Sequence, residues 1–219
     1  PFGHVSAKRD KVFRSLWAAP CRLAAALRRR RQLGRPRPVA FAVAMDLIKV
    51  ALASPSPQAV QAMAGLRHIC DALGPERTRT ELLPYLTEEI VRGNVNDEAL
   101  FAIAVALGRL PPRCAGDASL AGPALLAPLR ELMCVEDAAT REAAVTSVRA
   151  LGDELPAAAL APHLTPLVLE LGTHTDWHTP RVAACGVLPL AYRACAVLEA
   201  KALLGEAAEA EATSAPAAP

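Results

Sequence analysis

A pattern that returns after about forty residues is the feature of this 219-residue sequence that most limits its fold. The letters RxAA begin at Arg141 and again at Arg181, and a Pro-Leu pair begins at Pro128 and again at Pro166. The segment around Pro84 supplies an earlier copy of the second pattern. One unit of this length cannot bury both of its faces by itself, so several units must stack in tandem.

Each unit contains two segments with helical periodicity. Leu125, Leu129 and Leu132 recur at a spacing that places them on one face of an α-helix, and Leu100 with Leu107 marks a similar face. Ala and Leu make up more than a third of the chain, whereas β-branched residues are sparse and aromatic residues reach only 4%, which excludes an all-β sandwich. The expected first helices are 45–54, 80–91, 122–134 and 161–172, and the expected second helices are 57–73, 98–110, 138–152 and 180–195. We therefore predict an all-α fold, an α-solenoid of about four helical hairpins of the HEAT type.

Residue types that favour helix starts support these boundaries. Asp97 and Asp137 precede two of the second helices, where a carboxylate can accept from a free backbone N–H. Thr78 and Glu81 have the spacing of a capping box. A capping residue followed by proline stands at Ser56-Pro57 and at Thr179-Pro180.

Charge divides the chain into two regions. Residues 1–44 contain eleven Lys or Arg and one acid, a net charge of +10, whereas the remaining residues carry −8. The basic extension fits three interpretations: an upstream stretch translated before a start at Met45, an organelle presequence, or an arm that binds nucleic acid. The predicted domains are a basic extension at 1–44, the solenoid at 45–200 with units at about 45–75, 76–112, 120–155 and 160–197, and a disordered low-complexity tail at 201–219.

The sequence shows no pattern of a catalytic, cofactor or metal site. The common nucleophile, phosphate-loop and dinucleotide motifs are absent, so we expect a non-enzyme without a cofactor. His174, Asp176 and His178 resemble a ligand set, but they fall in an expected turn and lack a fourth ligand, so we predict no metal site. Apolar runs are too short or too interrupted to predict a membrane span. The six cysteines form no CxxC pair, which favours reduced thiols in the cytoplasm, with the nucleus as a second compartment.

Two long runs resemble one known family. The run ALGPERTRTELLPYLT at 72–87 and the run DWHTPRVAACG at 176–186 resemble the second and fourth repeats of the scaffold (A, 65-kilodalton regulatory) subunit of protein phosphatase type 2A. The intervening segments 136–151 and 160–171 follow the same family in order. The resemblance covers about Met45 to Ala200, the amino-terminal part of that scaffold.

The resemblance implies a non-catalytic scaffold whose turns within the repeats form a ridge that binds regulatory B subunits. It implies that the catalytic subunit binds only carboxyl-terminal repeats that this sequence lacks, and it implies neither a nucleic-acid nor a membrane partner. The matching turn positions are Asn96, Asp97, Glu98, Glu136, Asp137, Asp176, Trp177 and His178.

Several alternatives remain open from the residues. The carboxylates in the turns could dock basic groups of a partner or only cap helices in solvent. Trp177 is either an interface anchor or a plug beneath its turn. Arg141 and Arg181 either pair with acids across neighbouring repeats or are solvated. A different HEAT-repeat adaptor, in transport or assembly, would have the same fold, and the fourth repeat is expected to leave an apolar face open.

Overall fold

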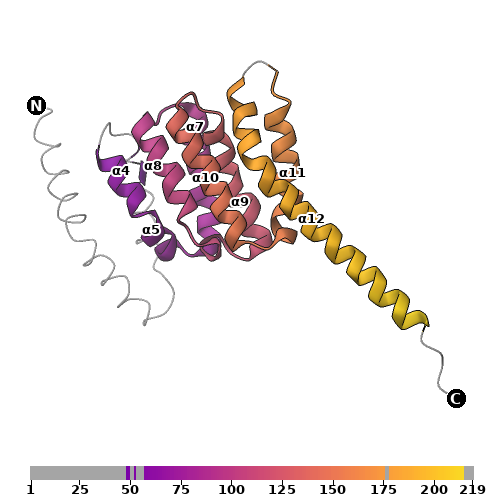
Figure 1. The fold of residues 1–219 in the computed structure, drawn as a ribbon. Coiled ribbons are helices and arrows are strands. Elements are labelled where there is room, and N and C mark those ends of the chain that lie inside the picture. The colour runs from indigo at the N-terminus through magenta and orange to yellow at the C-terminus, as the bar shows by residue number, and fades with distance from the viewer. Residues whose placement is uncertain (1–47, 50–51, 53–56, 176–177, 215–219) are drawn as a thin grey trace, which may run out of the picture.

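The computed structural model describes residues 48–49, 52, 57–175 and 178–214, and within these residues it contains helices and no strand. The helices form two layers (Figure 1). One layer contains α7 (Leu83–Arg92), α9 (Ala118–Met133) and α11 (Ala157–Gly172). The other contains α4 (Pro57–Ala64), α5 (Leu66–Leu73), α8 (Asp97–Gly108), α10 (Ala138–Glu154) and α12 (His178–Ser214). Consecutive hairpins stack on one another, which confirms the predicted α-solenoid.

Short helical segments connect α5 with α7 and α8 with α9. The segment after α5 consists of α6 (Pro75–Arg77) and the π-helical turn η1 (Thr78–Leu82), which leads directly into α7. The 3-10 helix η2 (Pro112–Ala115) precedes α9. Of the expected first helix at 45–54, the structure describes only Ile48, Lys49 and Leu52, and the two apolar side chains are buried.

The apolar stripes predicted from the sequence lie in the core. Ile103, Leu107 and Leu129 have no exposed surface, and Leu125 has 1%. These side chains point between the two layers, where apolar surface removed from water contributes about 25 cal/mol per Å² to stability. The core is therefore continuous along the stack rather than centred in one place.

Small residues allow the helices of the second layer to approach closely. A Cβ atom added to Gly108 of α8 would lie 2.8 Å from the Cα atom of Ser147 in α10. A Cβ atom added to Gly186 of α12 would lie 2.7 Å from a methyl carbon of Val145 in α10. The Ser147 hydroxyl also donates a 2.7 Å hydrogen bond to the carbonyl of Ala104 in α8. These contacts fix the spacing between successive hairpins.

The predicted helix caps are partly correct. Asp137 caps α10, since its carboxylate accepts from the backbone N–H of Thr140 at 2.8 Å. The prediction for Asp97 is wrong by one residue: Asn96 accepts from the N–H of Ala99 at 2.8 Å, and α8 begins at Asp97. Both side chains can accept in this way, so the local sequence does not distinguish them.

Two further cap predictions differ from the structure. Thr78 is not a helix start, because helical structure already begins at Pro75, and its buried hydroxyl donates to the carbonyl of Cys70 at 3.5 Å. Thr179 lies inside α12, which begins one residue earlier at His178. Ser56 lies outside the described residues.

Helix α12 continues further than expected. The sequence predicts a disordered tail from residue 201, whereas α12 extends to Ser214. Ala and Glu dominate this segment, and both favour helix strongly enough to continue an existing helix. The prediction of disorder is therefore wrong for 201–214.

One stretch of α12, His178–Leu204, is long and apolar enough to cross a membrane by length and composition, although the sequence analysis expected no such span. A helix of a soluble core can meet the same criterion. Val187 and Leu190 of this stretch are buried in the stack, whereas Leu188 and Tyr192 are 54% and 74% exposed. Its first half is thus a packed helix of the solenoid with one open apolar face, as expected for the fourth repeat.

Candidate partner-binding edge

The turns within the hairpins lie along one edge of the stack. They comprise residues 93–96 between α7 and α8, 134–137 between α9 and α10, and 173–177 between α11 and α12. Because α8, α10 and α12 stack side by side, their amino-terminal ends face the same side of the molecule (Figure 1). We call this side the turn edge. The predicted site residues that the structure describes lie on this turn edge.

The turn of the second repeat presents an amide and two carboxylates. Gly93 ends α7 with a φ angle of 68°, a left-handed conformation that favours glycine and reverses the chain. Asn96, Asp97 and Glu98 follow, and all three are exposed. Asn96 uses its side-chain oxygen to cap α8, whereas the two carboxylates lie in the first turn of that helix. Negative charge is favourable there because the free N–H groups carry partial positive charge.

The turn of the third repeat presents Glu136 and Asp137. Glu136 is exposed, and Asp137 is half-buried because it caps α10. The Thr140 hydroxyl donates to the Asp137 carboxylate at 2.7 Å, and this bond together with the backbone N–H of Thr140 lowers the pKa of Asp137. Asp137 is therefore a cap and a surface charge at once.

Arg141 and Arg181 have a role that the sequence analysis did not consider. The Arg141 guanidinium donates to the carbonyls of Val135 and Glu136 at 3.0 and 2.6 Å. The Arg181 guanidinium donates in the same way to the carbonyls of His174 and Thr175. Among the described residues, neither arginine forms an ion pair within 4 Å, so the predicted pairing across repeats is not seen there. Each arginine instead stabilises the turn of its own hairpin through hydrogen bonds to the turn carbonyls.

The turn of the fourth repeat is only partly described. Asp176 and Trp177 lie outside the described residues, so the choice between an anchor and a plug for Trp177 stays a prediction. His178 is exposed at the start of α12. Within the described part of the chain, no three His, Cys, Asp or Glu residues are arranged to hold a metal ion.

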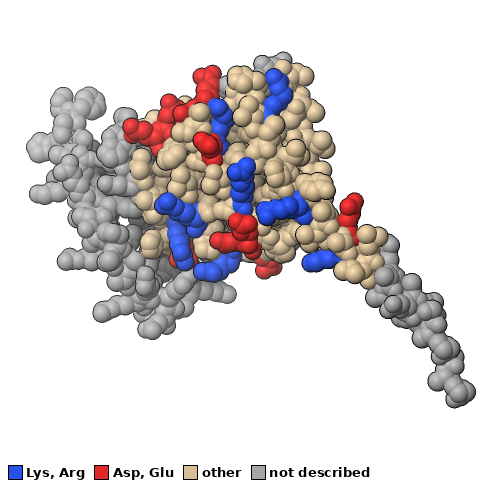
Figure 2. Space-filling model, viewed as in Figure 1, with Lys and Arg blue, Asp and Glu red and all other residues tan. Residues whose placement is uncertain are grey.

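The four described carboxylates of the turn edge are available to a partner. Among the residues that the structure describes, neither Asp97, Glu98, Glu136 nor Asp137 has a basic side chain within 4 Å, unlike acids elsewhere such as Glu170, which pairs with Arg130. Figure 2 shows acidic side chains at the upper left of the stack, with basic side chains beside them along the same upper edge. The second and third turns thus present four carboxylates that form no ion pair among the described residues, while the guanidinium groups of Arg141 and Arg181 lie on the turn carbonyls of the same edge.

A groove begins at the turn edge and runs between α4, α5 and α8. Its volume is about 820 Å³, and Asp97, Glu98 and Asp137 line it at the end nearest the turns. Phe101 and Val60, which are 44% and 39% exposed, contribute apolar surface to it. Neither residue was predicted from the sequence. Phe101 could have been noticed as a rare aromatic one helical turn after the acidic turn positions.

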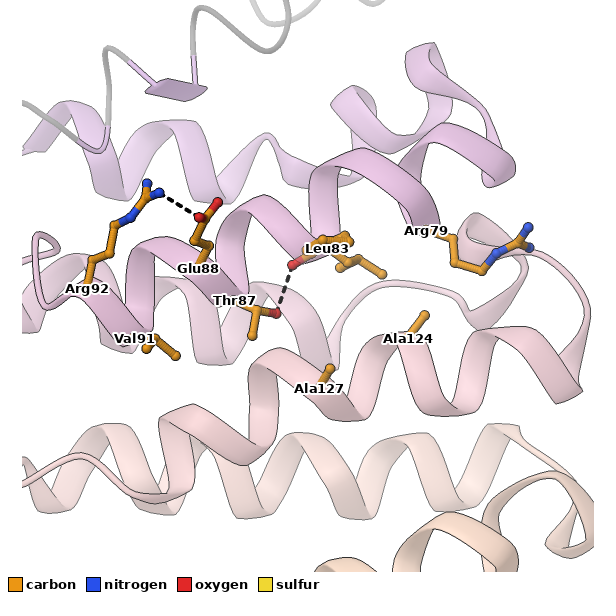
Figure 3. A pocket seen from close by; sticks show the side chains of 9 residues that line it. Arg79, Leu83, Thr87, Glu88, Val91, Arg92, Ala124 and Ala127 are labelled. Carbon is orange, nitrogen blue, oxygen red and sulfur yellow. Dashed lines mark hydrogen bonds and ion pairs between the residues drawn. The ribbon is translucent and has the colours of Figure 1, made fainter.

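A second, smaller hollow lies in the other layer, between α7 and α9 (Figure 3). Its volume is about 590 Å³, and the polar side chains that α7 contributes to it form bonds within that helix. The Thr87 hydroxyl donates to the Leu83 carbonyl at 2.9 Å, and Arg92 pairs with Glu88 at 2.5 Å. None of the predicted site residues lines it.

Comparison with known proteins supports the resemblance seen in the sequence. No family model matches the chain. Over 127 residues it is 42% identical to the beta isoform of the 65 kDa regulatory subunit of serine/threonine-protein phosphatase 2A from Rattus norvegicus, a match that covers 58% of this chain and 20% of that protein. It is 37% identical over 127 residues to the protein phosphatase 2A scaffold subunit of Dictyostelium discoideum, covering 58% and 21%.

A yeast protein gives the same result. The chain is 38% identical over 129 residues to a protein named as a regulatory subunit of protein phosphatase PP2A in Saccharomyces cerevisiae, covering 58% of this chain and 19% of that protein. The matched region therefore spans about a fifth of the length of each relative. The similarity to this family of scaffold subunits, first inferred from two runs of residues, is confirmed.

Proposed function

We propose that this chain is a non-catalytic scaffold of a protein phosphatase 2A complex and binds a regulatory B subunit through the turn edge. The observation that carries the proposal is the 42% identity over 127 residues to a protein named as a 65 kDa regulatory subunit of that phosphatase. The relatives are named as regulatory or scaffold subunits, which supports a role without catalysis.

The geometry of the turn edge supports its use as the contact surface. Exposed charges that form no ion pair among the described residues have no such pair to break on binding, and they accelerate encounter with a partner of opposite charge. Glu98 and Glu136 are such charges, and they stand on adjacent hairpins whose spacing is fixed by close helix packing. A partner whose basic groups are spaced as Glu98 and Glu136 are would therefore bind at one position along the edge.

The catalytic subunit is proposed to be absent from the contacts of this chain. What supports this is the implication of the resemblance that the catalytic subunit binds carboxyl-terminal repeats, which the matched region does not include. We expect this chain alone to capture a regulatory B subunit but not the catalytic subunit. Tight direct binding of the catalytic subunit would contradict this part of the proposal.

Charge reversal along the turn edge tests the proposal. We expect Glu98→Lys combined with Glu136→Lys to weaken capture of a purified regulatory B subunit by at least about tenfold, since two attractive contacts become repulsive. Neither residue caps a helix, so circular dichroism should be unchanged. The Trp177→Ala variant tests the aromatic position, with weaker capture expected if this residue is an anchor.

A matched control has the same change in charge away from the turn edge. Glu154 is the last residue of α10 and Glu199 lies in the distal half of α12, and both are exposed. Glu154→Lys combined with Glu199→Lys should leave capture unchanged. Equal capture by wild type and by the turn-edge variant would show that the partner binds elsewhere.

A further inference from the structure

The groove at the turn edge combines two kinds of surface. At the end nearest the turns it has the carboxylates of Asp97, Glu98 and Asp137, and at other points along its wall it has the basic side chains of Arg67 and Arg109. Phe101, which is 44% exposed, adds apolar surface. An occupant that fits must therefore offer cations to the acidic end and apolar side chains to the wall.

We propose that the occupant is the chain's own basic extension, through residues 20–37. This segment contains Leu23 and Leu27, four positions apart, followed immediately by four consecutive arginines, Arg28 to Arg31. The arginines supply cations to the turn-edge carboxylates, which form no ion pair among the described residues, and the leucines supply apolar side chains for the surface around Phe101. The chain thus contains a ligand for its own groove.

Charge determines both the choice of occupant and its orientation. Residues 1–44 have eleven basic residues and a single acid, Asp10, so the extension cannot neutralise itself. The rest of the chain carries −8, and the acids of the turn edge have no ion-pair partner among the described residues. Arg67 and Arg109 repel a run of arginines, so the run lies at the carboxylate end.

The connection is long enough for this arrangement. Ile48 is fully buried in the stack, so the extension is fixed at that point. The 17 residues from Arg31 to Ile48 can span about 60 Å when extended, whereas the 12-residue helix α8 is about 18 Å long. A tethered segment experiences an effective concentration in the millimolar range, so weak contacts suffice to hold it. The proposal does not require the phosphatase function.

Limited trypsin digestion of the full chain provides the test. Cleavage after Arg28 to Arg31 is measured relative to cleavage after Arg14, which lies in the same extension but outside the docked segment. At 50 mM salt we expect this relative rate in wild type to be at least about tenfold lower than at 500 mM, because salt screens the contacts. Asp97→Asn, Glu98→Gln and Asp137→Asn together should remove the protection, and asparagine at 137 still caps α10.

Matched variants separate the groove from general charge effects. Asp153→Asn, Glu154→Gln and Glu199→Gln together remove the same charge from exposed positions outside the groove and should retain full protection. Phe101→Ala should reduce protection about threefold or more without loss of helix. Equal relative cleavage in wild type and in the groove variant at 50 mM salt would overturn the proposal.

Photo-crosslinking identifies the occupant directly. Benzoylphenylalanine placed at position 27 should crosslink to peptides that contain Val60 or Phe101. Mixing isotope-labelled and unlabelled chains distinguishes a segment of the same chain from that of a second copy. Crosslinks within single chains support the proposal. Crosslinks between chains, or crosslinks confined to other surfaces, would overturn it.

Discussion

At the scale of single residues, the recurrence of arginine is explained by the turns and not by contacts between repeats. Arg141 and Arg181 follow their turns at the same interval, and each donates to two turn carbonyls. Carbonyl groups in a turn have no partner in a helical ladder, and a nearby arginine can donate hydrogen bonds to them. A residue can thus recur at one repeat length because each repeat needs it locally.

The interaction between Asp137 and Thr140 predicts a pH dependence. Both the hydroxyl and the backbone N–H of Thr140 stabilise the charged carboxylate, which lowers its pKa below the usual 3.8. The folded state gains this stabilisation above the unfolded pKa and loses it as the pH falls through the lower folded pKa. We expect Thr140→Val to raise the pKa of Asp137 toward 3.8, measured by NMR titration of its carboxyl carbon.

The control for this measurement is Thr80→Val. The Thr80 hydroxyl donates to the Glu76 carbonyl at 2.9 Å and has no contact with Asp137. The titration of Asp137 should be the same in this variant as in wild type. If the Thr140→Val variant also titrates as wild type does, the hydroxyl does not contribute to the cap.

At the scale of helices, the contact between α8 and α10 requires glycine at one position. Alanine at 108 would place its Cβ atom 2.8 Å from the Cα atom of Ser147, and a backbone atom cannot move aside cheaply. We expect Gly108→Ala to destabilise the fold by about 1–3 kcal/mol, as overpacking does, even though alanine favours helix. Urea unfolding followed by circular dichroism measures the change.

Gly172 is the matched position. Like Gly108 it is the last residue of its helix, but the nearest atom to an added Cβ is the Ala184 methyl carbon at 4.0 Å. Gly172→Ala should therefore be neutral or slightly stabilising. A similar loss of stability in both variants would indicate that the end of the helix, and not the contact between helices, requires glycine.

Helix existence was predictable from the sequence, whereas the groove was not. Helices α8 and α10 were located closely because caps and apolar stripes are local signals, as for Asp137 and the stripe of Leu100 and Leu107. The expected helix 57–73 is instead divided into α4 and α5 at Gly65. Composition misled the prediction at 201–214, where low complexity and helix propensity point to different states. The groove combines Val60, Phe101 and Asp137 from three parts of the chain, and spacing within one helix does not show which helices face each other.

At the scale of the whole molecule, the main contacts between helices of the described residues lie within a hairpin or between adjacent hairpins. The bonds between hairpins join residues about one repeat apart: Ser147 to Ala104 at 2.7 Å, Arg130 to Glu170 at 3.0 Å, and Arg149 to Gly186 at 2.7 Å. In such a stack, stability is approximately a sum of terms within hairpins and between adjacent hairpins. A change at one boundary should therefore have local consequences.

Ser147→Ala tests whether that locality holds. It removes the bond between α10 and α8, which is worth about 1 kcal/mol, equivalent to about a fivefold change in an opening equilibrium. Hydrogen exchange should show about fivefold lower protection for amides of α8 and α10, with α11 unchanged, because α11 does not share that boundary. Ser119→Ala, at an exposed position in α9, should leave every helix unchanged. An equal loss of protection in all helices would mean that the stack opens as one cooperative unit. A partner bound at the turn edge would then change hydrogen exchange in every helix of the stack.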